Sequence, residues 1–291
     1  PSHVAQIGKA AYLRLETHPA AGVMGKTSRG IFLRLEGDRI VFLSGESYRG
    51  PLTLNLGGPA HGLDSCQVGE SVQVDGGRLR FAGCGVELDY NRATGWEAPP
   101  LPAAALPPQE RSARLLAVAR LVLSDRPGSG LSGLLPGLLG LPGLPAGKRF
   151  PVDLDCLQAA LSGGLWAPAL AAALPFLGLG SGLTPSGDDL LLGLLLALTR
   201  WGPPPGLRFD TASFAKGLLS EAPQRTTALS AELLACAAEG QADERLVAAL
   251  DALLAGTATP DSCAAGLLSW GHSSGCDALV GMALFMGLVH D

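Results

Sequence analysis

The sequence predicts an α+β protein in which a β-rich N-terminal barrel or sandwich precedes an all-helical C-terminal domain. In residues 1–98, short apolar–polar alternations separated by glycine turns are typical of strands. From residue 109 onward, apolar residues recur at helical spacing, and no strand-like alternation interrupts them. Prolines between residues 99 and 108 separate the two patterns and indicate a stiff linker. We therefore expect a β-rich domain over 1–98, a linker over 99–108 and a helical domain over 109–291.

The β-rich region contains two predicted hairpins and one further strand. Residues 31–35 and 40–43 are apolar segments on either side of a glycine–aspartate turn. Residues 72–74 and 79–81 alternate around an Asp-Gly-Gly turn, which is the strongest hairpin signal in the sequence. Residues 86–90 are expected to add a strand. Short strands at this spacing favour a small barrel or sandwich.

In the C-terminal region, helical periodicity is bounded by capping residues, glycines and prolines. Asp153 is expected to cap one helix, and consecutive prolines at 203–205 separate two others. Residues 127–147 repeat Leu, Gly and Pro, and are expected to form either an ordered apolar loop or a mobile flap. The expected helices cover 109–124, 153–162, 168–174, 187–201, 211–219, 226–239, 243–255, 260–270 and 275–289.

The composition favours a folded protein without a nucleic-acid or membrane partner. Hydrophobic residues make up 47% of the chain, which argues against disorder. The net charge of -5 and the scattered basic residues argue against a nucleic-acid track. The uncharged segment 165–183 is interrupted by prolines and glycines, and 190–199 is too short to span a bilayer. Because the sequence starts Pro1-Ser2-His3 without a charged or apolar leader, we expect a cytoplasmic protein.

The cysteines are expected to be reduced, buried thiols that pack as small apolar side chains. No two of them have the C-x-x-C spacing of a metal site, and nothing in the sequence indicates the secretion that favours disulfides. They are Cys66, Cys84, Cys156, Cys236, Cys263 and Cys276.

Two segments of the helical region, residues 186–193 and 274–281, share the pattern S-G-x-D-x-L-x-G. Each follows a polar, glycine-containing loop and precedes an apolar helix. A serine with an acid three positions later is a capping-box pattern, so each copy could simply cap its helix. Three features favour a ligand site. They are the Gly-x-Gly-x-Gly loop, which lets backbone N–H groups approach an anion, the extra carboxylate of Asp188, and the position of His272 beside the second copy.

A third polar segment opens another predicted helix. Thr226, Thr227 and Ser230 place their hydroxyl groups on one helix face. Arg225 precedes them with a guanidinium that suits a carboxylate or phosphate. From the spacing alone, an N-cap threonine with ordinary surface neighbours is the slightly better interpretation.

These segments together define a predicted site for a small anionic or phosphorylated substrate, bound at paired helix N-termini. Asp188, Asp189 and His272 are the predicted catalytic groups, with His272 polarising a carbonyl or moving a proton. Alternatively, Asp188, Asp189 and Asp277 could hold a Mg²⁺ ion that carries a phosphate. The predicted substrate-binding residues are Gly180, Ser181, Gly182, Thr184, Ser186, Gly187, Arg225, Thr226, Thr227, Ser230, Ser273, Ser274, Gly275 and Asp277.

The motifs resemble those of a known bacterial family. Residues 178–189, which read Gly-Leu-Gly-Ser-Gly-Leu-Thr-Pro-Ser-Gly-Asp-Asp, resemble the signature of a family named for AllH, a subunit of oxamate carbamoyltransferase. This family was formerly a domain of unknown function. Residues 226–230 and 272–277 resemble its later motifs in the same order. The resemblance covers the helical half well and the β-rich half only loosely.

The resemblance implies a role in anaerobic purine breakdown. The implied reaction transfers a carbamoyl group from oxalurate to phosphate, or in reverse, and gives oxamate and carbamoyl phosphate. It also implies a hetero-oligomer with two other subunits, and it assigns no catalytic residue. Three alternatives stay open: a Mg²⁺–nucleotide- or acyl-phosphate-dependent, carboxylase-like enzyme, a non-catalytic ligand-binding subunit, and a structural module whose motifs only cap and pack helices.

Overall fold

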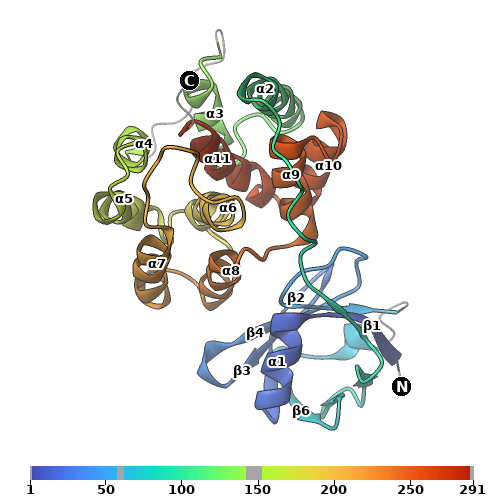
Figure 1. Ribbon diagram of the computed structural model, residues 1–291. Helices are drawn as coiled ribbons and strands as arrows, with labels where there is room; N and C mark the ends of the chain where they lie inside the picture. Colours follow the sequence, from blue (N-terminus) through green and yellow to red (C-terminus); the bar gives the residue numbers. More distant parts are fainter. Residues whose placement is uncertain (1, 58–61, 142–152, 289–291) are drawn as a thin grey trace. The chain divides into compact units, whose positions relative to one another are not determined.

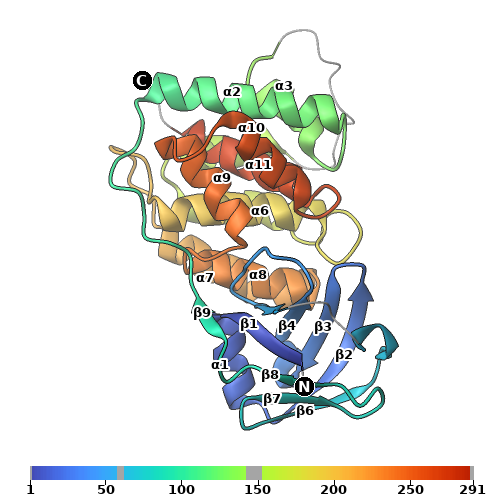
Figure 2. The same ribbon diagram turned by 90° about the vertical axis from the view of Figure 1, so that its right-hand side faces the viewer.

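The computed structural model describes residues 2–57, 62–141 and 153–288 (Figures 1 and 2). Contacts divide the chain into two compact units, Pro1–Pro99 and Pro100–Asp291. The first unit consists mainly of strands and the second of helices, which confirms the predicted α+β class.

The strands of the first unit form a closed barrel. The sheet order is β5-β4-β3-β2-β6-β7-β8-β1, and β1 pairs with β5 to close the ring, while β9 pairs with another part of β1. Buried apolar side chains such as Leu33, Leu54 and Leu79 form its core. The strands are β1 (Ser2–Gly8), β2 (Ala20–Thr27), β3 (Gly30–Leu35), β4 (Ile40–Ser44), β5 (Thr53–Leu56), β6 (Ser71–Asp75), β7 (Arg78–Phe81), β8 (Glu87–Asp89) and β9 (Thr94–Trp96).

Both predicted hairpins are confirmed. Strands β3 and β4 pair antiparallel, as do β6 and β7. Between β6 and β7, Gly76 and Gly77 have φ angles of 53° and 74°. Two consecutive positive φ angles match the right-handed twist of the flanking strands, which explains why glycines occupy this turn.

One helix of the barrel unit, α1 (Lys9–Thr17), was not predicted. Its buried residues are Ala11 and Leu15, one helical turn apart, and they join the barrel core. Two buried positions in nine residues give too short a periodic signal to separate a helix from the surrounding strands.

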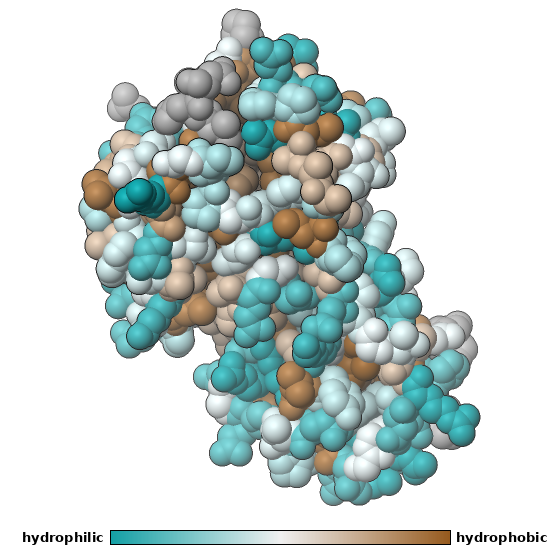
Figure 3. Space-filling view, viewed as in Figure 1, coloured by the Kyte–Doolittle hydropathy of each residue, from teal (hydrophilic) through white to brown (hydrophobic). Residues whose placement is uncertain are grey.

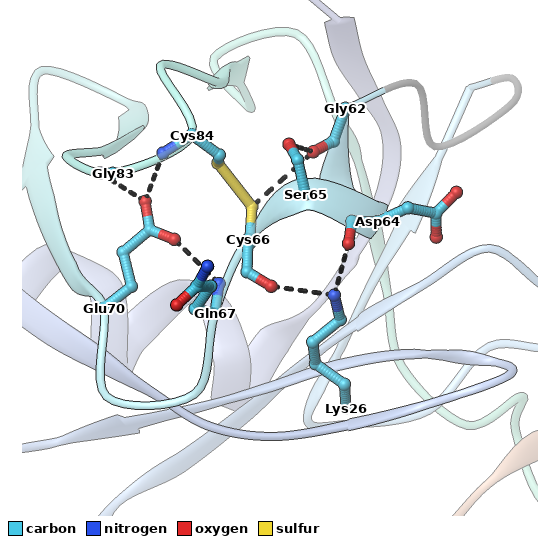
Figure 4. The surroundings of a disulfide bond; sticks show 9 residues. All are labelled: Lys26, Gly62, Asp64, Ser65, Cys66, Gln67, Glu70, Gly83 and Cys84. Atoms are coloured by element: carbon cyan, nitrogen blue, oxygen red, sulfur yellow. Dashed lines mark hydrogen bonds between the residues drawn. A yellow bond between two sulfur atoms is a disulfide. The ribbon is translucent and has the colours of Figure 1, made fainter.

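The expectation that all cysteines are reduced is wrong for one pair, because Cys66 and Cys84 form a disulfide (Figure 4). They are 18 residues apart, a spacing that carries no signal, and the β6–β7 hairpin brings them together. Glu70 supports the junction, since its carboxylate accepts N–H groups of Gln67, Gly83 and Cys84. The cysteines that form no disulfide and are buried, as expected, are Cys236, Cys263 and Cys276, whereas Cys156 forms no disulfide and is exposed.

The predicted helices of the second unit are found, with ends that shift by a few residues. The largest difference is in α7, which continues through Pro223 to Arg225. Residues 127–141 contain two short helical turns, whereas 142–147 lie outside the described residues. The helices are α2 (Pro108–Asp125), α3 (Leu135–Leu138), α4 (Leu154–Ser162), α5 (Trp166–Ala173), α6 (Ser186–Arg200), α7 (Thr211–Arg225), α8 (Ala228–Ala238), α9 (Glu244–Ala255), α10 (Pro260–Ser269) and α11 (Ser274–Met286), with 3-10 turns η3 (Ser132–Leu134) and η4 (Leu174–Phe176).

Apolar side chains on the surface are scattered among polar ones on the face shown in Figure 3. Within the parts of the chain that the structure describes, no helix has both the length and the apolar character needed to span a membrane.

Helices α6 and α11 lie side by side in the middle of the helical unit (Figures 1 and 2). Residues 187–198 of α6 and 274–285 of α11 are all buried. A helix that is buried on every side needs other elements around it, and the remaining helices of the unit supply that cover.

Glycines allow these two helices to cross with their backbones in contact. A β-carbon added at Gly193 would lie 2.1 Å from the carbonyl oxygen of Ala278. One added at Gly281 would lie 1.9 Å from the carbonyl oxygen of Leu190. Each glycine ends one copy of the S-G-x-D-x-L-x-G pattern and contacts the fifth residue of the other copy. The two copies therefore meet reciprocally.

We expect Gly281→Ala to lower the free energy of unfolding by about 2 kcal/mol or more, because the methyl group would overlap backbone atoms. Gly266→Ala in α10 is the matched control, since nothing lies within 4 Å of its added β-carbon. Alanine favours a helix over glycine by roughly 1 kcal/mol, so this control should be neutral or stabilising. Urea unfolding measures both variants, and equal stabilities would contradict the close crossing.

Candidate functional site

The two repeated motifs do not cap their helices in the predicted way. Ser186 and Ser274 are the first residues of α6 and α11, and the N-cap positions are occupied by Pro185 and Ser273. Neither helix start has a side-chain cap hydrogen bond. The serine and acid of each copy are therefore available for contacts with the other copy.

These contacts are reciprocal, like those of the glycines. The hydroxyl of Ser274 lies against the carboxyl of Asp189, and the hydroxyl of Ser186 lies against that of Asp277. Thr184 joins the group, with 3.2 Å between its Oγ1 and Oγ of Ser274. The first and fourth residues of each copy thus form one polar cluster at the crossing of α6 and α11.

Burial dominates the electrostatics of the two carboxyls. Asp189 is 1% exposed and Asp277 is 0% exposed. Burial raises the pKa of Asp189 well above its ordinary value, against the effect of the Ser274 and Thr184 hydroxyls, and the nearby charge of Asp277 raises it further. Burial also raises the pKa of Asp277 to about 6, opposed by the Leu131 N–H group and by the hydroxyls of Ser186 and Ser273.

One oxygen of each carboxyl lacks a hydrogen-bond partner. Oδ2 of Asp189 and Oδ2 of Asp277 are both buried, and neither has hydrogen-bond geometry to a donor of the residues that the structure describes. The hydroxyls of Ser274 and Thr184 face the first carboxyl, and those of Ser186 and Ser273 face the second. Buried polar atoms in folded proteins are nearly always hydrogen-bonded, because an unpaired one costs about 1–3 kcal/mol. Two such oxygens in one cluster make the crossing of α6 and α11 the candidate site.

Asp188 differs from its neighbour because both of its oxygens are engaged. Oδ1 accepts the N–H group of Gly178 at 2.8 Å, and Oδ2 accepts the hydroxyl of Thr226. Burial raises its pKa, opposed first by Thr226 and then by Gly178 and Ser230. Asp188, predicted as catalytic, thus fastens the loop before α6 to the loop before α8. This arrangement favours Asp189 and Asp277 over Asp188 as the groups that meet a ligand.

The glycine-rich loop supplies fewer open N–H donors than its pattern suggests. The N–H group of Gly187 donates to the carbonyl of Leu179 at 2.8 Å, and that of Gly275 donates to the carbonyl of Trp270 at 3.0 Å. The exposed part of the loop comprises Gly180, Ser181 and Gly182, with φ angles of 121° for Gly180 and 101° for Gly182. Backbone donors for an anion are therefore expected in the exposed part of the loop.

In the third predicted segment, residues 225–230, some residues cap α8 and others contact neighbouring loops. Thr227 is the N-cap of α8 and accepts the N–H group of Ser230, as the simpler interpretation predicted. Its hydroxyl also donates to the carbonyl of Leu183 at 2.7 Å. Oγ of Ser230 is buried and faces the carboxyl of Asp188. Arg225 is exposed and pairs with Glu221 at 3.0 Å, so the structure does not bring its guanidinium to the carboxyl cluster.

Residues 126–131, which follow α2, contact the start of α11, and no sequence pattern indicated this. The Leu131 N–H group donates to Oδ1 of Asp277 at 2.5 Å. A β-carbon at Gly130, where φ is 53°, would lie 2.2 Å from that oxygen. Nη1 of Arg126 donates to the backbone carbonyls of Gly271 and His272, whereas the side chain of His272 itself lies at the surface.

The three aspartates do not gather as a metal site. Among the described residues, the one group of three potential ligands whose atoms lie within 4.8 Å of one another is Cys66, Glu70 and Cys84. Its two sulfur atoms form the disulfide already described. Asp188, Asp189 and Asp277 do not meet this distance as a set, so the geometry gives no support to a Mg²⁺ ion held by all three.

The buried cluster and its loops fall within a segment that matches a family model. Residues 176–286 match the family of the oxamate carbamoyltransferase subunit AllH. This is the family that the motifs resemble. The match runs from the end of η4 through α11 and leaves out the barrel unit and residues 126–131. No solved structure matches the chain.

We expect the stability of the helical unit to depend on pH because Asp277 has a raised pKa. Its pKa is about 6 when folded and 3.8 ordinarily, so the folded chain keeps this proton to a higher pH than the unfolded chain. The free energy of unfolding therefore falls as the pH rises from about 4 to about 6, by about 3 kcal/mol for this group.

Asp277→Asn removes this titration while preserving an oxygen that accepts from Leu131. We expect a flatter dependence of stability on pH in the variant, measured by urea unfolding from pH 4 to 7.5. An unchanged slope would contradict the raised pKa of Asp277. Asp261→Asn, at an exposed position of α10, is the control and should keep the wild-type slope.

Proposed function

We propose that the chain is a subunit of a carbamoyltransferase that uses oxamate or a closely related substrate, with Asp189 and Asp277 at its ligand site. The match of residues 176–286 to the AllH family supports the class of reaction. The observation that carries the site is the pair of buried, unpartnered Oδ2 atoms at the crossing of α6 and α11. The description of the family as a subunit also supports assembly with other carbamoyltransferase chains.

The chemistry of the cluster suits an amide or carbamoyl group. A carboxylate oxygen accepts hydrogen bonds, and the NH2 group of oxamate or carbamoyl phosphate supplies two donors. The reciprocal arrangement presents one free oxygen from Asp189 and one from Asp277. Hydrogen bonds from the NH2 group to these two oxygens would both bind and orient such a nitrogen.

Carbamoyl transfer also requires a proton to move at this nitrogen. When phosphate attacks the carbamoyl carbon of oxalurate, the bond from that carbon to the oxamate nitrogen breaks, and the nitrogen takes up a proton. In the reverse direction, the oxamate nitrogen attacks carbamoyl phosphate, phosphate leaves, and the nitrogen loses a proton. A carboxyl whose pKa is about 6, like that of Asp277, can both give and accept this proton near neutral pH.

The remaining predicted residues take supporting roles in this proposal. Thr184 and Ser186 are half-buried and face the carboxyls of Asp189 and Asp277, so their hydroxyls can donate to the substrate. The exposed backbone of 180–182 is available to its anionic end. Asp188 and Thr226 position the loop, and His272 is a surface group at the same helix start. Because both Oδ2 atoms are shielded from solvent, a covering segment must move for the substrate to reach them.

Binding of oxamate and carbamoyl phosphate to the purified chain tests the proposal, by calorimetry and by the rise in melting temperature. Asp189→Asn should weaken binding about tenfold or more, because it replaces one acceptor oxygen with an NH2 group. Asp261→Asn is a matched control outside the cluster and should bind like the wild type. If neither ligand binds the wild type, or if Asp189→Asn binds as tightly, the proposed site is wrong.

A further inference from the structure

The geometry points to Arg126 as the residue that binds the anionic end of the substrate. This inference rests on the proposed function and adds a residue that lies outside the AllH match. It starts from residues 126–131, which reach the cluster in two places. Arg126 contacts the loop before α11, and Leu131 contacts Asp277 in the first turn of α11.

Arg126 is held at the start of α11 with part of its guanidinium unused. Nη1 donates to the carbonyls of Gly271 and His272. Nη2 has no acceptor among residues 2–57, 62–141 and 153–288. The nearest carboxylate is that of Asp125, 3.7 Å from Nε, and it is 58% exposed. Such a surface pair is weak, so the positive charge of Arg126 is largely available to a ligand.

The charge of Arg126 reaches the residue that precedes Asp277. Burial raises the pKa of the Cys276 thiol to about 11, and the charge of Asp277 adds to the rise, whereas the charge of Arg126 acts in the opposite direction. The side chain of Arg126 is 30% exposed, which leaves it open to solvent on one side. The cluster thus has buried acceptor oxygens within and a guanidinium at its edge.

Arg126 takes the role that the sequence suggested for Arg225. The guanidinium of Arg225 is paired with Glu221, one helical turn earlier, and is exposed. A guanidinium binds a carboxylate or phosphate through two parallel N–H donors. A substrate with an NH2 group at one end and an anionic group at the other is therefore complementary to Asp189, Asp277 and Arg126 together. A neutral diamide would keep the contacts with the carboxyls and lose the contact with Arg126.

The experiment compares oxamate with oxamide, its neutral diamide analogue, in calorimetric titrations of the full chain. Arg126→Gln should weaken oxamate binding about tenfold or more and leave oxamide binding unchanged. Arg126→Lys keeps the positive charge but not the two parallel N–H donors. Its oxamate affinity should therefore lie between those of the wild type and Arg126→Gln. Arg120→Gln, at an exposed position of α2, is the matched control and should bind both ligands like the wild type.

A second readout is the dependence of oxamate affinity on salt. Affinity should fall with added NaCl in the wild type and in Arg126→Lys, and stay nearly constant in Arg126→Gln. An equal loss of both ligands in Arg126→Gln, or a wild-type salt dependence in that variant, would overturn the role of Arg126 and leave the proposed function intact. A wild type that binds neither ligand would instead overturn the proposed function.

Discussion

The close crossing of α6 and α11 is the contact on which the candidate site depends. Gly193 and Gly281 let each helix backbone touch the carbonyl of the other, and a side chain at either position would separate them. At that separation, Asp189 faces Ser274 and Asp277 faces Ser186. Packed backbones are less adaptable than loops, so this crossing fixes the two carboxyls more firmly than the flanking loops could.

This arrangement of the two carboxyls opposes the stability of the fold. Two buried carboxyls with unpaired oxygens raise the free energy of the folded state, and their raised pKa values express the same cost. Such a cost commonly persists at functional sites, where an external group satisfies it. Asp188, next to Asp189, has a structural role, because its two oxygens accept hydrogen bonds from Gly178 and Thr226 and hold these residues against α6.

Local patterns explain why much of the fold could be predicted and why parts of the site could not. Hairpins and helices follow from periodicity and turn residues, which are contiguous in sequence. The disulfide between Cys66 and Cys84 and the contact of residues 126–131 with Asp277 join distant segments, so no local pattern reveals them. The serine–aspartate spacing is the same for a helix cap and for this buried cluster. The missing side-chain cap hydrogen bonds and the burial of Asp189 and Asp277 separate the two interpretations, and neither can be read from the sequence.

The most direct test of the account is a crystal structure of the chain with oxamate bound. The account predicts the amide nitrogen of oxamate within hydrogen-bond distance of Oδ2 of Asp189 and Oδ2 of Asp277, at the crossing of α6 and α11. Oxamate bound elsewhere, or bound there by loop N–H groups with both Oδ2 atoms still unpartnered, would contradict it.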